Sequence, residues 1–190
     1  MSAGGTRKAA QFFERMLNST NLLYQAQKRA VIHKIATPAQ GVKGRMTFTT
    51  KSTVDYVGAL APRGRTVAFD AKTSHGTTFP IGHIRPHQVD YLKAVRGVGG
   101  VAFFLIWMVE CNRIWVLPIT DEFLSVHWDT ARRPSLTIGD LSRLGVEVTG
   151  WSETYPQCDY LAAAQTWKPP SSEFNVSQAV TEHQAVTCGD

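Results

Sequence analysis

The spacing of apolar residues predicts both helices and strands in this chain. In residues 8–29, Phe13, Met16, Leu17 and Tyr24 recur at helical spacing with Lys and Arg on the remaining surface, which predicts an amphipathic helix. Runs of β-branched and aromatic residues, or of continuous apolar residues, predict strands. We expect strands at 30–35, 47–50, 53–60, 65–72, 101–109 and 113–119.

Glycine and proline mark the connections between these segments. The turn sequence Ala61-Pro62-Arg63-Gly64 predicts that residues 53–72 form a β-hairpin. Residues 39–46 (AQGVKGRM) predict an exposed excursion and residues 73–84 a loop.

Two further helices follow from local signals. Pro86 is a favoured first-turn residue, and the helix it begins is expected to end at Gly97. Thr120 is an N-cap residue for a helix over 120–129. The alternation of helices and strands predicts an α/β fold with a central mixed β-sheet flanked by helices.

Composition agrees with one globular domain. The chain has 190 residues, of which 43% are hydrophobic and 18% charged. We expect a domain over residues 1–167, followed by a flexible C-terminal tail over 168–190, because the tail is polar with few apolar anchors.

Charge is unevenly spread along the chain. The formal net charge is +5, but residues 151–190 hold five acids and one lysine, a net of −4. The first 150 residues therefore hold 19 basic and 10 acidic side chains, a net of +9. A positive net charge on this part of the chain suggests a polyanionic partner such as DNA.

Several classes of protein are excluded by what the sequence lacks. The three cysteines, Cys111, Cys158 and Cys188, form no C-x-x-C pair, so no zinc knuckle or disulfide framework is indicated and a reducing compartment fits best. The N-terminal residues hold no apolar signal segment, and the longest apolar run, 101–109, is far shorter than the ~20 residues of a membrane-spanning helix. We expect a cytoplasmic protein without membrane contact.

Two acids and a lysine stand at the ends of the predicted hairpin strands. Alternation along 65–72 places Asp70 and Lys72 on one face, and Asp55 lies on the neighbouring antiparallel strand. Two adjacent carboxylates repel each other unless a cation lies between them, and Mg²⁺ accepts one or two carboxylates with water and phosphate. Lys72 could stabilise charge on a phosphate or help to position a water. This set meets the needs of phosphodiester hydrolysis.

The same residues have a simpler interpretation. Asp55 and Lys72 could form a surface ion pair worth ~0–1 kcal/mol, with Asp70 a solvated acid at the end of a strand. Spacing alone leaves both interpretations open.

A family resemblance favours the first interpretation. Asp55 followed by Asp70-Ala71-Lys72 resembles the signature of PD-(D/E)xK nucleases, with Val54 where a proline usually stands. More narrowly, six stretches in order are similar to the RecU-type Holliday junction resolvases. They are 18 NSTNLLY 24, 32 IHKIATPAQ 40, 51 KSTVDYVGAL 60, 67 VAFDAK 72, 79 FPIGHIRPHQVDYL 92 and 99 GGVAFFLI 106.

The resemblance implies a fold, an activity and roles for residues. It implies a restriction-endonuclease-like core and a homodimeric endonuclease that cuts four-way DNA junctions symmetrically with Mg²⁺, for which Mn²⁺ can substitute. Asp55 and Asp70 would be catalytic metal ligands, Lys72 the catalytic lysine, and the backbone carbonyl of Ala71 a further ligand. A bacterial cell or a phage-infected host would be its setting.

Two further residues match the wider superfamily. Glu14 corresponds to the acid of the first helix, a catalytic residue and metal ligand, although it could instead be a solvated acid paired with Arg15 or Lys8. Gln88 corresponds to the polar residue of the second helix that faces the metal, although it could instead cap that helix.

The chain departs from the family in two places. The family usually has Glu where this chain has Asp70, which is one methylene shorter. The segment between Pro38 and Lys51 is also shorter than the family's projecting stalk, which reaches into the centre of the junction.

Basic residues near the hairpin in sequence are candidates for DNA phosphate contacts, although a solvated basic face is the simpler alternative. They are His33, Lys34, Lys43, Arg45, Lys51, Arg63, Arg65 and Arg85. Two other functions stay open from the sequence: a non-catalytic DNA-binding accessory module of recombination, and a nuclease of the same superfamily for other branched DNA.

Overall fold

The structure, a computed structural model, describes the chain from the first helix to residue 166 with short gaps. The described residues are 3–36, 39–42, 45–48, 53–128, 134–151 and 158–166, without the side chains of 3–4, 39–42, 45–48 and 126–127. The predicted tail over 168–190 lies outside them.

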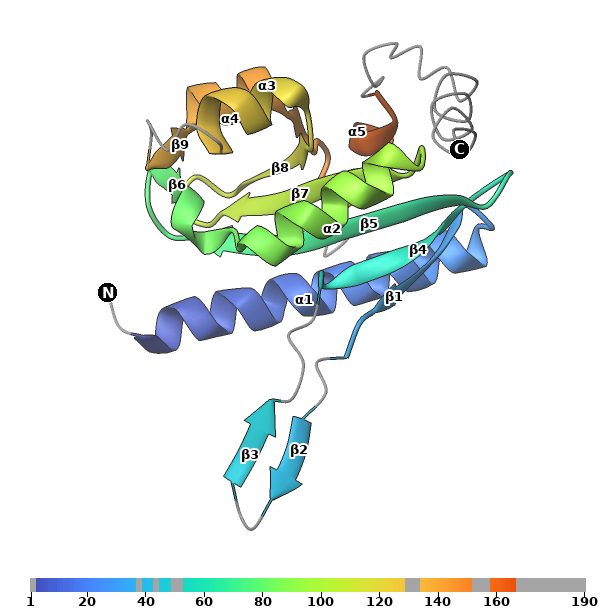
Figure 1. Cartoon of the computed structure of the whole chain (residues 1–190), viewed down its shortest axis with the longest axis horizontal. Coiled ribbons are helices and arrows are strands. Elements are labelled where there is room, and N and C mark those ends of the chain that lie inside the picture. Colours follow the sequence, from blue (N-terminus) through green and yellow to red (C-terminus); the bar gives the residue numbers. More distant parts are fainter. Residues whose placement is uncertain are drawn as a thin grey trace, which may run out of the picture.

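A six-stranded mixed sheet forms the centre of the described part of the chain (Figure 1). In spatial order its strands are β1 (Ala30–Lys34), β4 (Tyr56–Leu60), β5 (Arg65–Ser74), β7 (Val101–Met108), β8 (Arg113–Pro118) and β10 (Val146–Glu147). Neighbouring strands are antiparallel except for β5 and β7, which are parallel. A parallel pair needs a crossover connection, and the helix α2 (Pro86–Gly97) lies within it.

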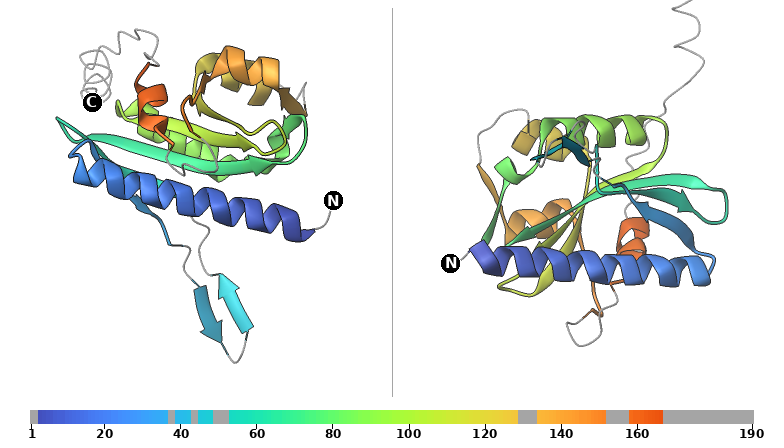
Figure 2. Two further views of the ribbon diagram at one scale, coloured as in Figure 1. Left: turned by 180° about the vertical axis from the view of Figure 1, so that it is seen from behind. Right: turned by 90° about the horizontal axis from the view of Figure 1, so that it is seen from below.

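Helices cover both faces of this sheet, as two views at right angles show (Figure 2). The helices α1 (Ala3–Ala26) and α5 (Tyr160–Thr166) pack on one face, and α2, α3 (Asp121–Phe123) and α4 (Ile138–Leu144) pack on the other. Every residue of β7 is buried, which explains its continuous apolar sequence. The predicted α/β fold class, with a central mixed sheet between helices, is confirmed. No helix among the described residues is both long and apolar enough to cross a membrane.

Two small sheets correct the predictions for the loops. The strands β2 (Ala39–Val42) and β3 (Arg45–Phe48) pair as an antiparallel hairpin, which Figure 1 shows projecting away from the large sheet, so the predicted excursion has regular structure. In the predicted loop over 73–84, β6 (Thr78–Pro80) pairs with β9 (Ser135–Thr137), and a 3₁₀ turn, η1 (Ile81–His83), follows.

The limits of the predicted helices vary in accuracy. The second helix has the predicted limits, Pro86–Gly97. The first begins and ends earlier than the predicted 8–29. The segment 120–129 begins at the predicted N-cap, since Thr120 Oγ1 accepts a hydrogen bond from the Phe123 amide at 3.0 Å, but α3 then continues as a π-helical segment, η2 (Leu124–Trp128).

A stack of aromatic rings fixes the relative position of three strands and α5. Tyr56, Phe69 and Phe103, from β4, β5 and β7, stack with ring centroids 4.7 and 4.9 Å apart. Tyr160 of α5 packs on Phe69 at 5.0 Å. Aromatic pairs of this kind contribute ~0.5–1.5 kcal/mol beyond the area they bury. The stack therefore holds the part of β5 that immediately precedes Asp70.

The closeness of β1 and β4 gives a stability prediction. At Gly58 of β4 an added Cβ atom would lie 2.2 Å from the carbonyl oxygen of Val31 and 2.7 Å from the Cα atom of Ile32. We expect Gly58→Ala to lower the free energy of unfolding by about 1–3 kcal/mol, because the backbones of two strands must separate. Urea denaturation measures this difference.

Gly97→Ala is the matched control. An added Cβ atom at Gly97 meets nothing within 4 Å, and the residue lies in a helix. This variant should be as stable as the parent or up to about 1 kcal/mol more stable. Equal stability of both variants would contradict the close approach of β1 and β4.

Candidate active site

Asp70 and Lys72 lie on the face of β5 that packs against α2. Neighbouring Val67 and Phe69 of β5 belong to the core under α1, while Ala68 belongs to the core under α2, so the strand alternates as predicted. The Lys72 Nζ atom lies 2.5 Å from Asp70 Oδ1. The Asp70 side chain is fully buried and the Lys72 side chain 15% exposed, so this ion pair is largely shielded from solvent.

Gln88 joins this pair to the beginning of α2. Its Nε2 donates to Asp70 Oδ2 at 2.5 Å, and its Oε1 accepts from Lys72 Nζ at 3.1 Å. The same Oε1 accepts from the Arg85 amide at 3.0 Å, which caps the helix that begins at Pro86. The two roles that the sequence left open for Gln88, a cap and a contact with the acid site, are therefore both present.

Asp55 reaches the same stretch of β5 from the other side. It immediately precedes β4. In the antiparallel pair Tyr56 faces Phe69, so the residue before Tyr56, Asp55, lies opposite the residue after Phe69, Asp70. Its Oδ2 accepts a hydrogen bond from the Ala71 amide at 3.0 Å. The N–H and C=O of one strand residue point to the same side, so the Ala71 carbonyl is expected to face this edge as well.

The two carboxylates affect each other electrostatically. The pKa of Asp70 is raised to about 6, chiefly by burial and then by repulsion from Asp55, against the opposing effect of Lys72. Among the described residues, the Lys72 ammonium group, 2.5 Å away, is the partner of Asp70 Oδ1.

This donor set fits a hard divalent cation. A buried carboxylate, a second carboxylate close by and a main-chain carbonyl are ligands that Mg²⁺ accepts together with water. No group of three or more His, Cys, Asp or Glu side chains that could hold a metal occurs in the part of the chain that the structure describes. A cation here would therefore depend on Asp55, Asp70 and backbone or water oxygens.

Glu14 lies beside Asp55 in a pocket under α1 of about 190 Å³, which Ala71 also lines. Its carboxylate forms an ion pair with Lys34 of β1, instead of the Arg15 or Lys8 considered from the sequence. Burial, and then the Glu14 and Asp55 carboxylates, raise the pKa of the Tyr56 hydroxyl. Both acids are thus close to Tyr56, but Glu14 is already paired.

Thr73 and Tyr56, which also line this pocket, were not singled out from the sequence. The signal was present, because alternation along β5 places Ala71 and Thr73 on the face opposite to Asp70 and Lys72.

The predicted DNA-binding residues separate into two groups in space. His33 and Lys34 are exposed on the edge strand β1, and Arg85 is exposed beside Gln88. Arg63 and Arg65 lie at the other end of the β4–β5 hairpin. Arg45 is on β3, where side chains are not described, and Lys43 and Lys51 lie outside the described residues.

Comparisons with known proteins identify the family of this chain. The family model described as Recombination protein U (RecU) matches residues 8–166. A relative from Shouchella clausii, named Holliday junction resolvase RecU, is 34% identical over 161 residues, covering 78% of this chain and 75% of its own. Relatives of the same name from Pediococcus pentosaceus and Streptococcus pneumoniae are 36% and 30% identical, covering 65% and 78% of this chain and 65% and 79% of their own lengths.

A solved structure is more distantly similar. It is the Holliday junction resolvase Hjc of Archaeoglobus fulgidus, with 17% identity, a TM-score of 0.44 and coverage of 71% of this chain and 93% of its own. The family model and the sequence relatives establish the family: this chain belongs to the RecU family.

Proposed function

We propose that this protein is a Mg²⁺-dependent, structure-selective endonuclease that resolves four-way (Holliday) DNA junctions by paired symmetric nicks. The observation that carries the proposal is the buried cluster of Asp70, Lys72 and Gln88 next to Asp55. The names of relatives that are 30–36% identical support the junction as the substrate.

Each residue of the cluster has a role in this proposal. Asp55, Asp70 and the Ala71 carbonyl would hold the cation, and Mn²⁺ is expected to substitute for Mg²⁺. When bound, the cation neutralises charge on the phosphate and lowers the pKa of a bound water. Lys72, whose side chain is 15% exposed, stabilises negative charge that develops on the phosphate.

Gln88 is a positioning residue in the same proposal. It donates to Asp70 and accepts from Lys72, so it fixes the orientation of an acid and a base relative to α2. Glu14 would contribute to the metal site only after it leaves Lys34, with which it is paired.

Features outside the cluster support a junction substrate. Lys34 lines the pocket beside Asp55, Arg85 is bonded through its amide to Gln88, and His33 is exposed next to Lys34, so these residues would contact backbone phosphates without reading sequence. The β2–β3 projection corresponds to the family's stalk and would enter the junction centre. Because a four-way junction has near two-fold symmetry and paired nicks need two sites, we propose a C₂ homodimer, which acts in the cytoplasm of a bacterial cell or phage-infected host.

The first prediction from the proposed function concerns the acids and the lysine. Asp55→Asn, Asp70→Asn and Lys72→Ala should each lower the nicking rate of a synthetic junction by roughly 100-fold or more, because each removes charge that the reaction needs. Junction affinity, measured by fluorescence anisotropy in EDTA, should stay within about threefold, since the DNA is held mainly by other phosphate contacts.

Asp90→Asn is the control for these variants. Asp90 is exposed on α2, two residues after Gln88, and the substitution makes the same chemical change away from the cluster. Loss of junction binding in all three cluster variants, with cleavage falling in proportion, would argue against a catalytic role.

The second prediction concerns the metal and the substrate. Wild-type protein should cut a four-way junction with Mg²⁺ or Mn²⁺ and stop cutting in EDTA, and should cut flap, linear duplex and single strand more slowly at the same salt concentration. Calorimetry without DNA should show Mg²⁺ binding that Asp55→Asn and Asp70→Asn weaken. DNA binding without any cut strand would instead favour a non-catalytic accessory module, and equal cutting of every branched substrate a broader nuclease.

The third prediction concerns Gln88. Gln88→Leu should lower kcat with little change in KM, because Asp70 and Lys72 remain but lose their common partner. It should also lower the free energy of unfolding by about 1–3 kcal/mol, since buried Asp70 Oδ2 loses its donor.

Two further variants make the Gln88 experiment decisive. Gln11→Leu, at an exposed position of α1, is the matched control and should change neither quantity. Gln88→Glu keeps the acceptor for Lys72 but places a carboxylate against Asp70, so it should not restore kcat. Full activity of Gln88→Leu would show that Gln88 does not position the catalytic residues.

A further inference from the structure

A second pocket lies at the other end of the β4–β5 hairpin from the acids. It has a volume of about 350 Å³, and we call it the hairpin pocket. The residues used below are Leu60, Pro62, Arg63, Arg65, Val101 and Gln165. Arg65 precedes Asp70 by five residues on β5, which corresponds to about 17 Å along the strand. The hairpin pocket is therefore separate from the cluster around Asp70.

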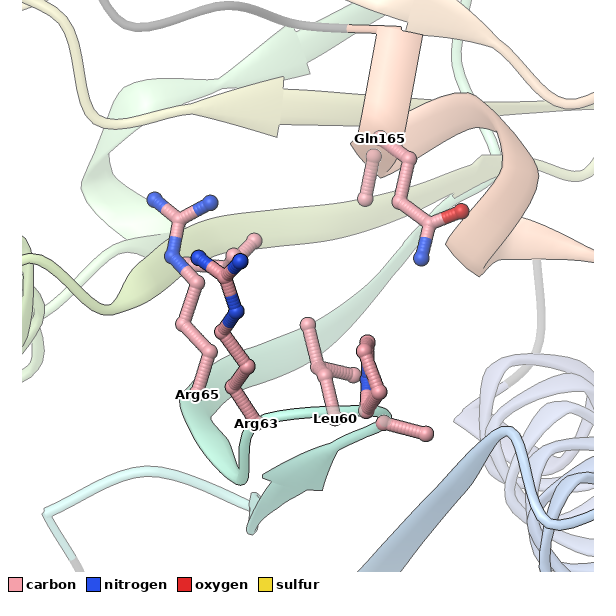
Figure 3. A pocket seen from close by; sticks show the side chains of 8 residues that line it. Leu60, Arg63, Arg65 and Gln165 are labelled. Atoms are coloured by element: carbon pink, nitrogen blue, oxygen red, sulfur yellow. The ribbon is translucent and has the colours of Figure 1, made fainter.

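Two arginines extend into this pocket from one tight turn (Figure 3). Gly64, between them, has φ +69°, a conformation that glycine adopts without strain. Arg65 Nε donates to the Gly99 carbonyl at 2.7 Å, which holds this side chain and leaves its terminal nitrogens for another partner. Neither Arg63 nor Arg65 forms an ion pair with an acid of the described residues.

The opposite wall, where Figure 3 shows Gln165, belongs to α5 and is firmly anchored. The Tyr24 hydroxyl of α1 donates to Asp159 Oδ1 at 2.9 Å and accepts from the Leu161 amide at 3.2 Å. Arg29 adds an ion pair with Asp159 at 3.0 Å. These contacts fix the helix that carries Gln165, so both walls of the pocket are held in place without a ligand.

The lining combines three kinds of chemistry. Leu60, Pro62 and Val101 give an apolar surface, the two guanidinium groups favour a phosphate, and Gln165 offers an amide donor and acceptor. A volume of about 350 Å³ lies within the usual range of small-ligand pockets. We propose that the hairpin pocket binds one nucleotide unit of a DNA strand, with its phosphate on Arg63 and Arg65 and its sugar or base on the apolar surface.

The location favours a strand of the substrate over a free nucleotide. The ~17 Å between Arg65 and Asp70 corresponds to roughly five nucleotides of a strand in a duplex. The acids and the pocket lie at opposite ends of the hairpin, so the pocket would contact an arm of the junction away from the cut. This inference rests on the proposed DNA substrate but not on catalysis.

Salt dependence of DNA binding tests the inference. In EDTA, where no strand is cut, fluorescence anisotropy with a labelled four-way junction is measured over a range of salt concentrations. Arg63→Gln/Arg65→Gln should weaken binding by roughly tenfold or more and reduce the slope of log K against log salt by about 1, because both contacts to one phosphate are lost. Arg63→Gln alone should have a smaller effect on both quantities, because it leaves Arg65 and its bond to Gly99 in place.

Arg7→Gln/Arg15→Gln is the matched control. Both residues are exposed on α1 outside the hairpin pocket, and the variant loses the same charge. If it weakens binding and reduces the slope as much as the pocket variants do, the effect is one of net charge and the inference is wrong. Thermal unfolding of every variant shows whether the fold is retained.

Titration with dTMP and with inorganic phosphate, followed by NMR, shows whether the pocket binds a DNA strand, a free nucleotide or phosphate alone. Binding of junction but not of dTMP, with dependence on Arg63 and Arg65, supports a site for strands. Binding of dTMP that the same variants abolish supports the pocket and adds free nucleotides to its ligands. Unchanged junction and dTMP binding in the pocket variants overturns the inference, even where wild-type protein nicks junctions normally.

Discussion

The burial of the Asp70 carboxylate is the constraint on which the site depends. A carboxylate that is fully shielded from solvent is stable only with close partners, and here these come from two elements. Lys72 follows on the same strand, and Gln88 comes from the first turn of α2. The position of α2 against β5 therefore sets the geometry of the acid, and the cap that begins α2 is part of the site as well as of the helix.

The parallel pairing of β5 and β7 is what brings α2 to this place. A parallel pair requires a crossover, and α2, within that crossover, packs on the sheet through Val89, Leu92 and Val95. On the other face α1 brings Glu14 to the pocket beside Asp55. The part of β5 that extends beyond the end of β4 is thus contacted by α2 on one face and lies near α1 on the other. This arrangement explains why Asp55, Asp70 and Glu14 lie near this edge and not in the middle of the sheet.

Local signals in the sequence predicted those features that local chemistry determines. Pro86 and Gly97 marked the limits of α2, and the apolar run over 101–109 marked β7. The period of two placed Asp70 and Lys72 on one face. The double role of Gln88 could not be predicted, because it depends on the distance between two elements that are joined by a loop. The same holds for α5, whose buried residues pack against an α1 that lies more than 130 residues earlier.

The short side chain at position 70 fits the way both carboxylates are held. Asp55 bonds to the Ala71 amide, so its oxygens stay close to the backbone of β5. An aspartate at position 70 also keeps its carboxylate close to that backbone, where a glutamate would extend one methylene further toward α2. The longer side chain is instead on the helix, since Gln88 spans the space to Asp70 and Lys72. In the proposed site, the short strand residue and the longer helix residue would together keep Asp55 and Asp70 within range of one cation, so a change at position 70 or 88 should disturb the other.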